Sequence, residues 1–77
     1  LDTCRDLGIA FVAFSPVGRG ALAAGVDDPA ALAEKDLRRN LPRFQPDHWP
    51  HNRQRVQQYN AIAAAHGVTP AQLSLAW

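Results

Sequence analysis

The segment 9–14 constrains the fold more than any other part of the chain, because it reads Ile-Ala-Phe-Val-Ala-Phe without a polar residue. The run is too short for a helix of ordinary length, and it lacks the alternation of apolar and polar residues found in strands with one wet face. Unbroken short apolar runs are typical of parallel strands covered on both faces. We therefore predict a buried strand over Ile9–Phe14 in an α/β fold.

The residues that follow this run have the chemistry of a phosphate-binding turn. Ser15 offers a hydroxyl, and Pro16 ends the hydrogen-bonded ladder of a strand. Gly18 and Gly20 allow another group to approach the backbone closely, and Arg19 carries a permanent positive charge. These groups suit a pyrophosphate, although a plain turn at the end of a strand could contain the same residues.

The flanking segments predict helices on both sides of this turn. Leu1–Leu7 is expected to be a helix, with Gly8 as the left-handed residue that ends it. After the turn, a long connection runs to about residue 50 and contains one short helix, Pro29–Lys35, with Asp28 as its cap. Connections this long in compact domains are often functional.

The clearest helix of the chain is predicted over Asn52–His66, and Gly67 ends it. Its apolar stripe, expected to pack on the wall of a larger fold, consists of Val56, Tyr59, Ile62 and Ala63. Thr69 and Pro70 are typical of the cap and the first position of a further helix.

Composition excludes several classes of protein. Apolar residues make up 47% of the chain, charged residues 19%, and the net charge is +1, so nothing points to a nucleic-acid or membrane partner. No apolar run approaches the roughly 20 residues of a membrane-spanning helix, and no basic-then-apolar signal peptide opens the chain. Cys4 is the single cysteine, so no internal disulfide forms. We expect a cytoplasmic protein, and the sequence leaves its oligomeric state open.

Three segments, in order, resemble the aldo-keto reductase family. Residues 14–20, Phe-Ser-Pro-Val-Gly-Arg-Gly, with Leu22 shortly after, resemble the loop after the seventh barrel strand of that family, with valine in place of the commoner leucine. Residues 36–45 and 67–77 resemble later segments. Residues 21–25 depart from the usual Leu-Thr-Gly ending, so only backbone contacts are expected there.

The resemblance implies that the chain belongs to a (β/α)₈ TIM barrel. Such a barrel has about 250 residues, and 77 supply only one or two of its βα units. Residues 1–77 are therefore expected to be part of one aldo-keto reductase barrel domain, a fragment incomplete at both ends.

The resemblance also implies a site for NADP. Phe14 would stack on the nicotinamide ring, the turn would lie over the pyrophosphate, and Arg38 would grip the adenosine end. The full set of expected cofactor-binding residues is Phe14, Ser15, Pro16, Val17, Gly18, Arg19, Gly20, Leu22 and Arg38. Two alternatives stay open, since Phe14 could be a core aromatic and Arg38 could pair with a carboxylate that pins the loop. For Arg39 and Arg43 the carboxylate pairing is favoured.

By resemblance, the protein would reduce a small-molecule aldehyde or ketone by hydride transfer from NADPH. The family's Asp, Tyr, Lys and His tetrad has no match here, and Tyr59 lies on a packing stripe, so no catalytic residue is expected and the isolated segment should be inactive. His48, His51 and His66 lack metal-ligand spacing, so no metal is expected. The alternatives are a regulatory relative similar to potassium-channel β-subunits, or a truncated inactive product.

Overall fold

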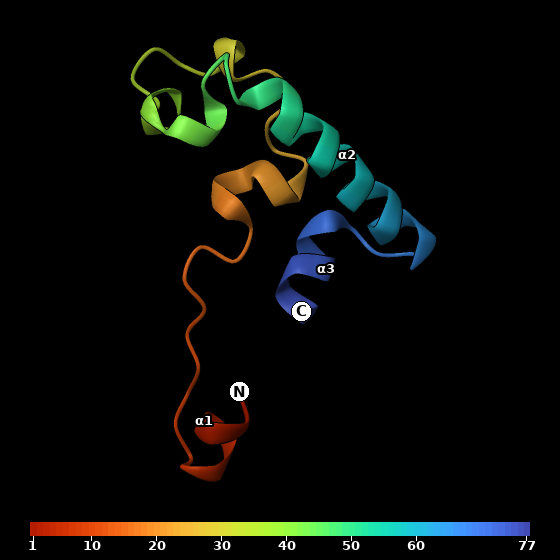
Figure 1. Cartoon of the computed structure of the whole chain (residues 1–77). Coiled ribbons are helices and arrows are strands. Elements are labelled where there is room, and N and C mark those ends of the chain that lie inside the picture. Colours follow the sequence, from red (N-terminus) through yellow and green to blue (C-terminus); the bar gives the residue numbers. More distant parts are fainter.

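The structure is a computed structural model that describes all 77 residues, and it consists of helices and loops (Figure 1). The α-helices are α1 (Asp2–Asp6), α2 (Trp49–Ala65) and α3 (Pro70–Ala76). Four short 3₁₀ helices lie between α1 and α2, namely η1 (Gly18–Ala23), η2 (Pro29–Ala31), η3 (Leu37–Asn40) and η4 (Pro42–Phe44). None of the helices combines the length and the apolar character needed to cross a bilayer.

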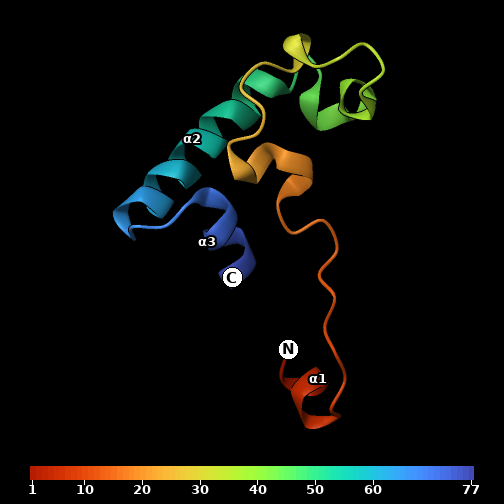
Figure 2. The same cartoon turned by 180° about the vertical axis from the view of Figure 1, so that it is seen from behind.

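The molecule is elongated, with extents of 44 × 30 × 18 Å. Helix α1 lies apart at one end, joined to the remaining elements by an extended segment, whereas η1, α2 and α3 lie side by side (Figures 1 and 2). Helix α1 confirms the first predicted helix, and Gly8 has the expected left-handed backbone, with φ of 64°.

The predicted strand over Ile9–Phe14 is wrong for this structure, because the segment is extended but belongs to no sheet. The backbone N–H groups of residues 10–15 and of Val17 donate no hydrogen bond to another backbone group. A strand requires a neighbour that completes its ladder, and this chain holds no second strand. The apolar side chains are consequently exposed, to 88% for Val12 and 90% for Phe14.

The hydrophobic core is small and lies where η1 and η4 meet the start of α2. It contains Ala21, Val26, Phe44 and Trp49, and the rings of Phe44 and Trp49 have their centroids 5.4 Å apart. The Trp49 indole N–H donates to the Asp27 carbonyl oxygen at 3.1 Å, so this buried side chain has a polar partner as well. The core therefore attaches the glycine-rich turn to α2.

Helix α2 begins earlier than predicted, at Trp49, because Pro50 occupies its first turn, where the missing N–H costs nothing. It ends as expected before Gly67, whose φ is 67°. The predicted apolar stripe packs only in part, since Ala63 is buried while Ile62 is 51% exposed. In this structure α2 packs on η1 and α3 instead of a barrel wall.

Helix α3 confirms the predicted cap and first-turn proline. The Gln72 backbone N–H donates to the Thr69 hydroxyl at 3.1 Å, and the Thr69 backbone N–H donates to the Gln72 side chain at 2.9 Å. The short helix expected over Pro29–Lys35 is only η2, capped as expected by Asp28, whose carboxylate accepts from the Ala30 N–H. It ends early because the backbone at Leu32 is extended.

Candidate functional site

Residues 15–25, which we call the glycine loop, contain an unusual run of left-handed backbone. Gly18 and Gly20 have φ of 57° and 93°, as glycine readily allows. Ser15, Arg19 and Ala24 also have positive φ, at 47°, 57° and 54°, which costs a non-glycine residue about 1 kcal/mol each. Backbone strain of this kind concentrates at ligand sites and switch regions.

Hydrogen bonds inside the loop hold this conformation. The Gly18 N–H donates to the Ser15 carbonyl at 3.0 Å. The Val17 carbonyl accepts two bonds, from the Gly20 N–H at 3.1 Å and from the Leu22 N–H at 3.0 Å. The loop is therefore two consecutive tight turns, closed on the Val17 carbonyl.

The same folding leaves three backbone donors of the loop unused. The N–H groups of Ser15, Val17 and Arg19 donate to no acceptor within the protein. The Arg19 side chain is exposed and makes no ion pair. Unpaired N–H groups in turns with left-handed residues are a common way to bind anions, and a guanidinium adds a full positive charge. The loop thus has the donors that a phosphate group requires.

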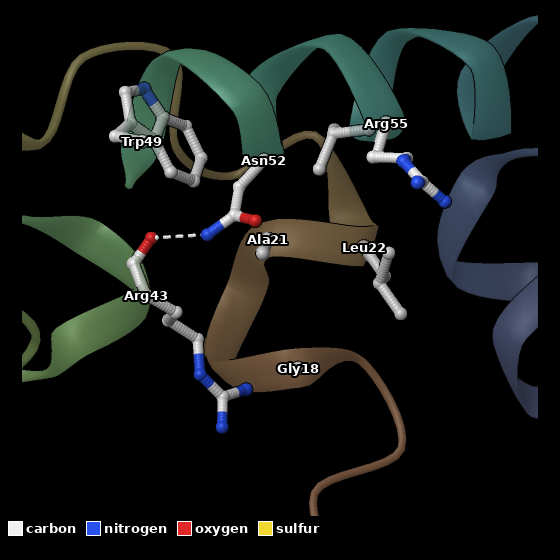
Figure 3. Close-up of a pocket in the computed structure, with 8 residues that line it drawn as sticks. Gly18, Ala21, Leu22, Arg43, Trp49, Asn52 and Arg55 are labelled. Carbon is white, nitrogen blue, oxygen red and sulfur yellow. Dashed lines mark hydrogen bonds between the residues drawn. The ribbon is translucent and has the colours of Figure 1, made fainter. Parts of the chain in front are cut away.

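A hollow of about 330 Å³ borders the loop and brings two predicted residues, Gly18 and Leu22, together with side chains of η4 and α2 (Figure 3). The side-chain amide of Asn52 donates to the Arg43 carbonyl oxygen at 2.8 Å, and the Arg43 guanidinium extends toward Gly18 (Figure 3). Arg55 lines the other side of the hollow, beyond Leu22.

Neither arginine of this hollow is neutralised, because Arg43 and Arg55 form no ion pair. The prediction that Arg43 pairs with a carboxylate is therefore wrong for this structure. Sequence reasoning missed Arg55 and Asn52 as residues of the site. The available signal was their spacing of three residues, which places two polar side chains on one face of a helix.

Phe14 and Pro16 border a second, larger hollow of about 750 Å³ between the extended segment and the end of α3. Trp77 and Leu75 line its far side. The Phe14 ring is 90% exposed, so it packs in no core of this structure and its face is free to stack. Pro16 and Leu22 also line a hollow of about 470 Å³ beside Tyr59.

Arg38 lies next to the glycine loop but is held by Asp36. Its Nη2 donates to Asp36 Oδ2 at 2.7 Å and its Nε donates to Asp36 Oδ1 at 3.0 Å, while its Nη1 donates to the Arg19 carbonyl at 3.4 Å. The side-chain hydrogen bond from Arg38 lowers the pKa of Asp36 from 3.8 to about 2, and the same bond raises the pKa of Arg38. The carboxylate pairing left open for Arg38 is the one observed.

Arg39 bonds to backbone oxygens where a carboxylate was expected. Its Nη1 donates to the Leu32 carbonyl at 2.8 Å and to the Ala30 carbonyl at 3.5 Å. Gln45 donates in turn to the Arg39 carbonyl. Arg39 therefore joins two parts of the long connection, as expected of a structural residue, but its partners are carbonyl oxygens and not a carboxylate.

The remaining polar side chains either form hydrogen bonds between neighbouring helices or lie outside the glycine loop. The Tyr59 hydroxyl is hydrogen-bonded between α2 and α3, to the Pro70 carbonyl and to Ser74. His48 and His51 line a hollow of about 320 Å³ with Asp47, and no three His, Cys, Asp or Glu side chains gather in a metal-binding geometry. Cys4 is a free thiol.

The whole chain is similar in sequence to known proteins. The sequence model of the aldo/keto reductase family matches residues 1–77. "Aldo-keto reductase str7" of Strobilurus tenacellus is 40% identical over 77 residues, which are 100% of this chain and 23% of that relative's length. No solved structure matches. The match over the whole chain confirms the resemblance to the family, and the chain belongs to the aldo/keto reductase family of oxidoreductases.

Proposed function

We propose that this chain is the part of an NADP-dependent aldo-keto reductase that binds the cofactor, in a protein that reduces an aldehyde or ketone. The observation that carries the proposal is the glycine loop, whose N–H groups at Ser15, Val17 and Arg19 have no acceptor in the protein. Charged ligands with several acceptor oxygens fit such a loop, and phosphates are the common case. When bound, NADPH supplies the hydride.

Different residues of the loop would contact different parts of the cofactor. The exposed face of Phe14 would support the nicotinamide ring, and the Ser15 hydroxyl and the three free N–H groups would donate to phosphate oxygens. Pro16, Val17 and Gly20 would shape the turn, and Gly18 and Leu22 would form the wall toward the hollow of Figure 3.

Charge near the loop supports a ligand with several negative charges. Arg19, Arg43 and Arg55 have no carboxylate partners, although the whole chain is nearly neutral. Arg38 contacts the same loop at the Arg19 carbonyl, so it stays in the proposed site. The preference for NADP over NAD is part of the proposal.

The proposal extends to the fold of the whole protein, a (β/α)₈ barrel in which residues 1–77 form part of one domain. Segment 9–14 would then be a strand between two neighbours. Its unpaired backbone groups and the exposure of Phe11 and Val12, at 60% and 88%, support this, because a central barrel strand needs partners on both edges and both faces.

No residue of this chain is proposed as catalytic. Tyr59, the single tyrosine, is hydrogen-bonded between two helices, which leaves it no role as a proton donor to a carbonyl. The proton donor would come from another part of the whole protein, and residues 1–77 alone would bind without turnover. A cytoplasmic location belongs to the same proposal, and imaging of the tagged protein tests it.

The decisive experiment is titration of NADPH into the natural protein that carries this chain, at its full length, followed by quenching of tryptophan fluorescence. The variant S15A/R19A should weaken binding at least tenfold. The matched control R53A, whose guanidinium bonds to Asp27 and to no residue of the loop, should leave it unchanged. Equal affinity of the wild type and S15A/R19A would refute the site. Tight binding without oxidation of NADPH by any aldehyde would indicate a regulatory relative instead of an enzyme.

A further inference from the structure

Asp36 has no assigned function, yet it holds the guanidinium of Arg38 from two directions. Its Oδ2 accepts from Nη2 at 2.7 Å, and its Oδ1 accepts from Nε at 3.0 Å. Asp36 Oδ1 also accepts from the Arg38 backbone N–H at 2.9 Å, as the cap of η3. These bonds to one neighbour leave the carboxylate and the guanidinium little freedom to rotate.

The free edge of this guanidinium is directed at the glycine loop. Arg38 Nη1 donates to the Arg19 carbonyl at 3.4 Å. A Cβ atom added at Gly20 would lie 3.2 Å from the same nitrogen, which is closer than side chains usually come. The absence of a side chain at Gly20 is thus what lets Arg38 reach the loop.

The contact controls one particular peptide plane. The Arg19 carbonyl and the Gly20 N–H belong to the same peptide group, and the N–H donates to the Val17 carbonyl at 3.1 Å. Arg38 holds the carbonyl end of this plane, and Val17 holds the amide end. A peptide plane fixed at both ends sets ψ of Arg19 and φ of Gly20, and with them the direction of the free N–H and side chain of Arg19.

We infer that Asp36 and Arg38 form a clasp that holds the glycine loop in its anion-binding conformation, so that Asp36 is a positioning residue for the cofactor site. This inference rests on the proposed function for its ligand. Under this inference Arg38 binds the backbone of the loop, whereas the family resemblance implies that Arg38 contacts the adenosine end of NADP directly.

The two roles of Arg38 make opposite predictions for the Asp36→Asn variant. If Arg38 holds the loop, loss of the carboxylate releases the guanidinium and weakens NADPH binding. If Arg38 is a direct ligand, the same change removes a competing anion and NADPH binds as tightly as before or more tightly. The control is Asp27→Asn, because the Asp27 carboxylate forms an ion pair with Arg53 at 2.8 Å and accepts no hydrogen bond from the glycine loop.

The test compares D36N, R38A, the double variant D36N/R38A and D27N in the full-length natural protein. Amide hydrogen exchange of Gly20 and Leu22, without ligand, reports the clasp. We expect D36N and R38A each to speed this exchange about tenfold, with no further effect in the double variant, because the two residues act as one unit. Unchanged exchange in D36N, as in D27N, would overturn the clasp.

The second readout is the steady-state kinetics with NADPH. Each clasp variant should raise KM for NADPH about tenfold and leave kcat at saturating NADPH unchanged, since the loop positions the cofactor and touches no reacting atom. R38K should not rescue KM, because an ammonium lacks the planar fork that reaches Asp36 and Arg19 together. An unchanged or lower KM in D36N would overturn the inference. Failure of the wild type to bind NADPH would refute the proposed function, while the exchange experiment would still decide the clasp.

Discussion

The hydroxyl oxygen of Tyr59 lies 2.6 Å from the Oγ atom of Ser74, and this hydrogen bond joins α2 to α3. The same hydroxyl donates to the Pro70 carbonyl at 3.1 Å, so both the first turn and the middle of α3 are attached to α2. Helix α3 also packs on η1, which forms part of the glycine loop. The orientation of α3 relative to α2 therefore affects how the two helices contact the loop.

Replacing Tyr59 with Phe should lower the free energy of unfolding by about 1 kcal/mol. The ring stays in place, and the two hydrogen bonds that are lost are only partly buried. Urea denaturation of Y59F, S74A and the double variant measures this. The two single effects should add to more than the effect of the double variant. Full additivity would mean that the two hydroxyls do not interact.

Replacing Thr69 with Ala should destabilise α3 by about 1 kcal/mol, because the N-terminal hydrogen bond to Gln72 is lost. Amide exchange of Gln72 and circular dichroism measure the effect. The matched control is T69S, which keeps the hydroxyl and should retain most of the helix. Equal helix content in T69A and T69S would show that the cap contributes nothing.

The two tryptophans should respond very differently to substitution by Ala in the 77-residue chain. Trp49 is 7% exposed and packs on Phe44, so W49A should cost about 3 kcal/mol of unfolding free energy. Trp77 is 99% exposed, so W77A should change it by less than about 0.5 kcal/mol. Chemical denaturation followed by far-ultraviolet circular dichroism compares the two, and similar losses would contradict the observed core.

Gly20→Ala should be more damaging than Gly8→Ala, although both residues have positive φ. The backbone strain of about 1 kcal/mol is common to both. Only at Gly20 would the new Cβ meet another group, the Arg38 guanidinium at 3.2 Å, while nothing lies within 4 Å at Gly8. Thermal denaturation of G20A and G8A isolates the effect of the contact. Equal melting temperatures would show that Arg38 moves aside freely.

The ion pair of Asp36 and Arg38 should persist to unusually low pH. The pKa of Asp36 is about 2 in the folded chain, below its ordinary value of 3.8, so the unfolded state binds the proton more readily. The pair therefore stabilises the fold fully above about pH 4, and this contribution disappears as the pH falls through about 2. Carboxyl ¹³C NMR measures the titration directly.

The matched comparison for this titration is the R38A variant. Without the guanidinium, the pKa of Asp36 should return toward its ordinary value, because the hydrogen bond from Arg38 is the largest cause of its lowering. An unchanged titration of Asp36 in R38A would show that the carboxylate is stabilised by other groups.

Local structure was largely predictable from the sequence. Gly8 and Gly67 end their helices in left-handed conformation, and Thr69 with Pro70 starts α3 as predicted. Asp28 caps η2 as predicted, too. These features depend on hydrogen bonds and steric limits within four or five residues, which a sequence displays directly.

The candidate site was predictable only in part. The glycines and Arg19 pointed to a phosphate-binding loop, and the structure adds its unused N–H groups. Arg55 lies 30 residues along the chain from the end of the loop at Gly25, and it joins the hollow only because α2 packs on η1. The proposed role of Asp36 was equally hidden, since it depends on the Arg38 guanidinium reaching the Arg19 carbonyl.

The family could be recognised from the whole chain's residues. The turns and the helix ends were also predictable before folding, because they depend on residue identity at short range. Tertiary structure decided which arginines remain unpaired, which carbonyl Arg38 reaches, and whether segment 9–14 is a strand. That last outcome depends on partners, because an apolar run such as Ile9–Phe14 becomes a strand only when neighbouring chains complete its hydrogen bonds. In these 77 residues no such neighbour is present, and the segment stays extended and exposed.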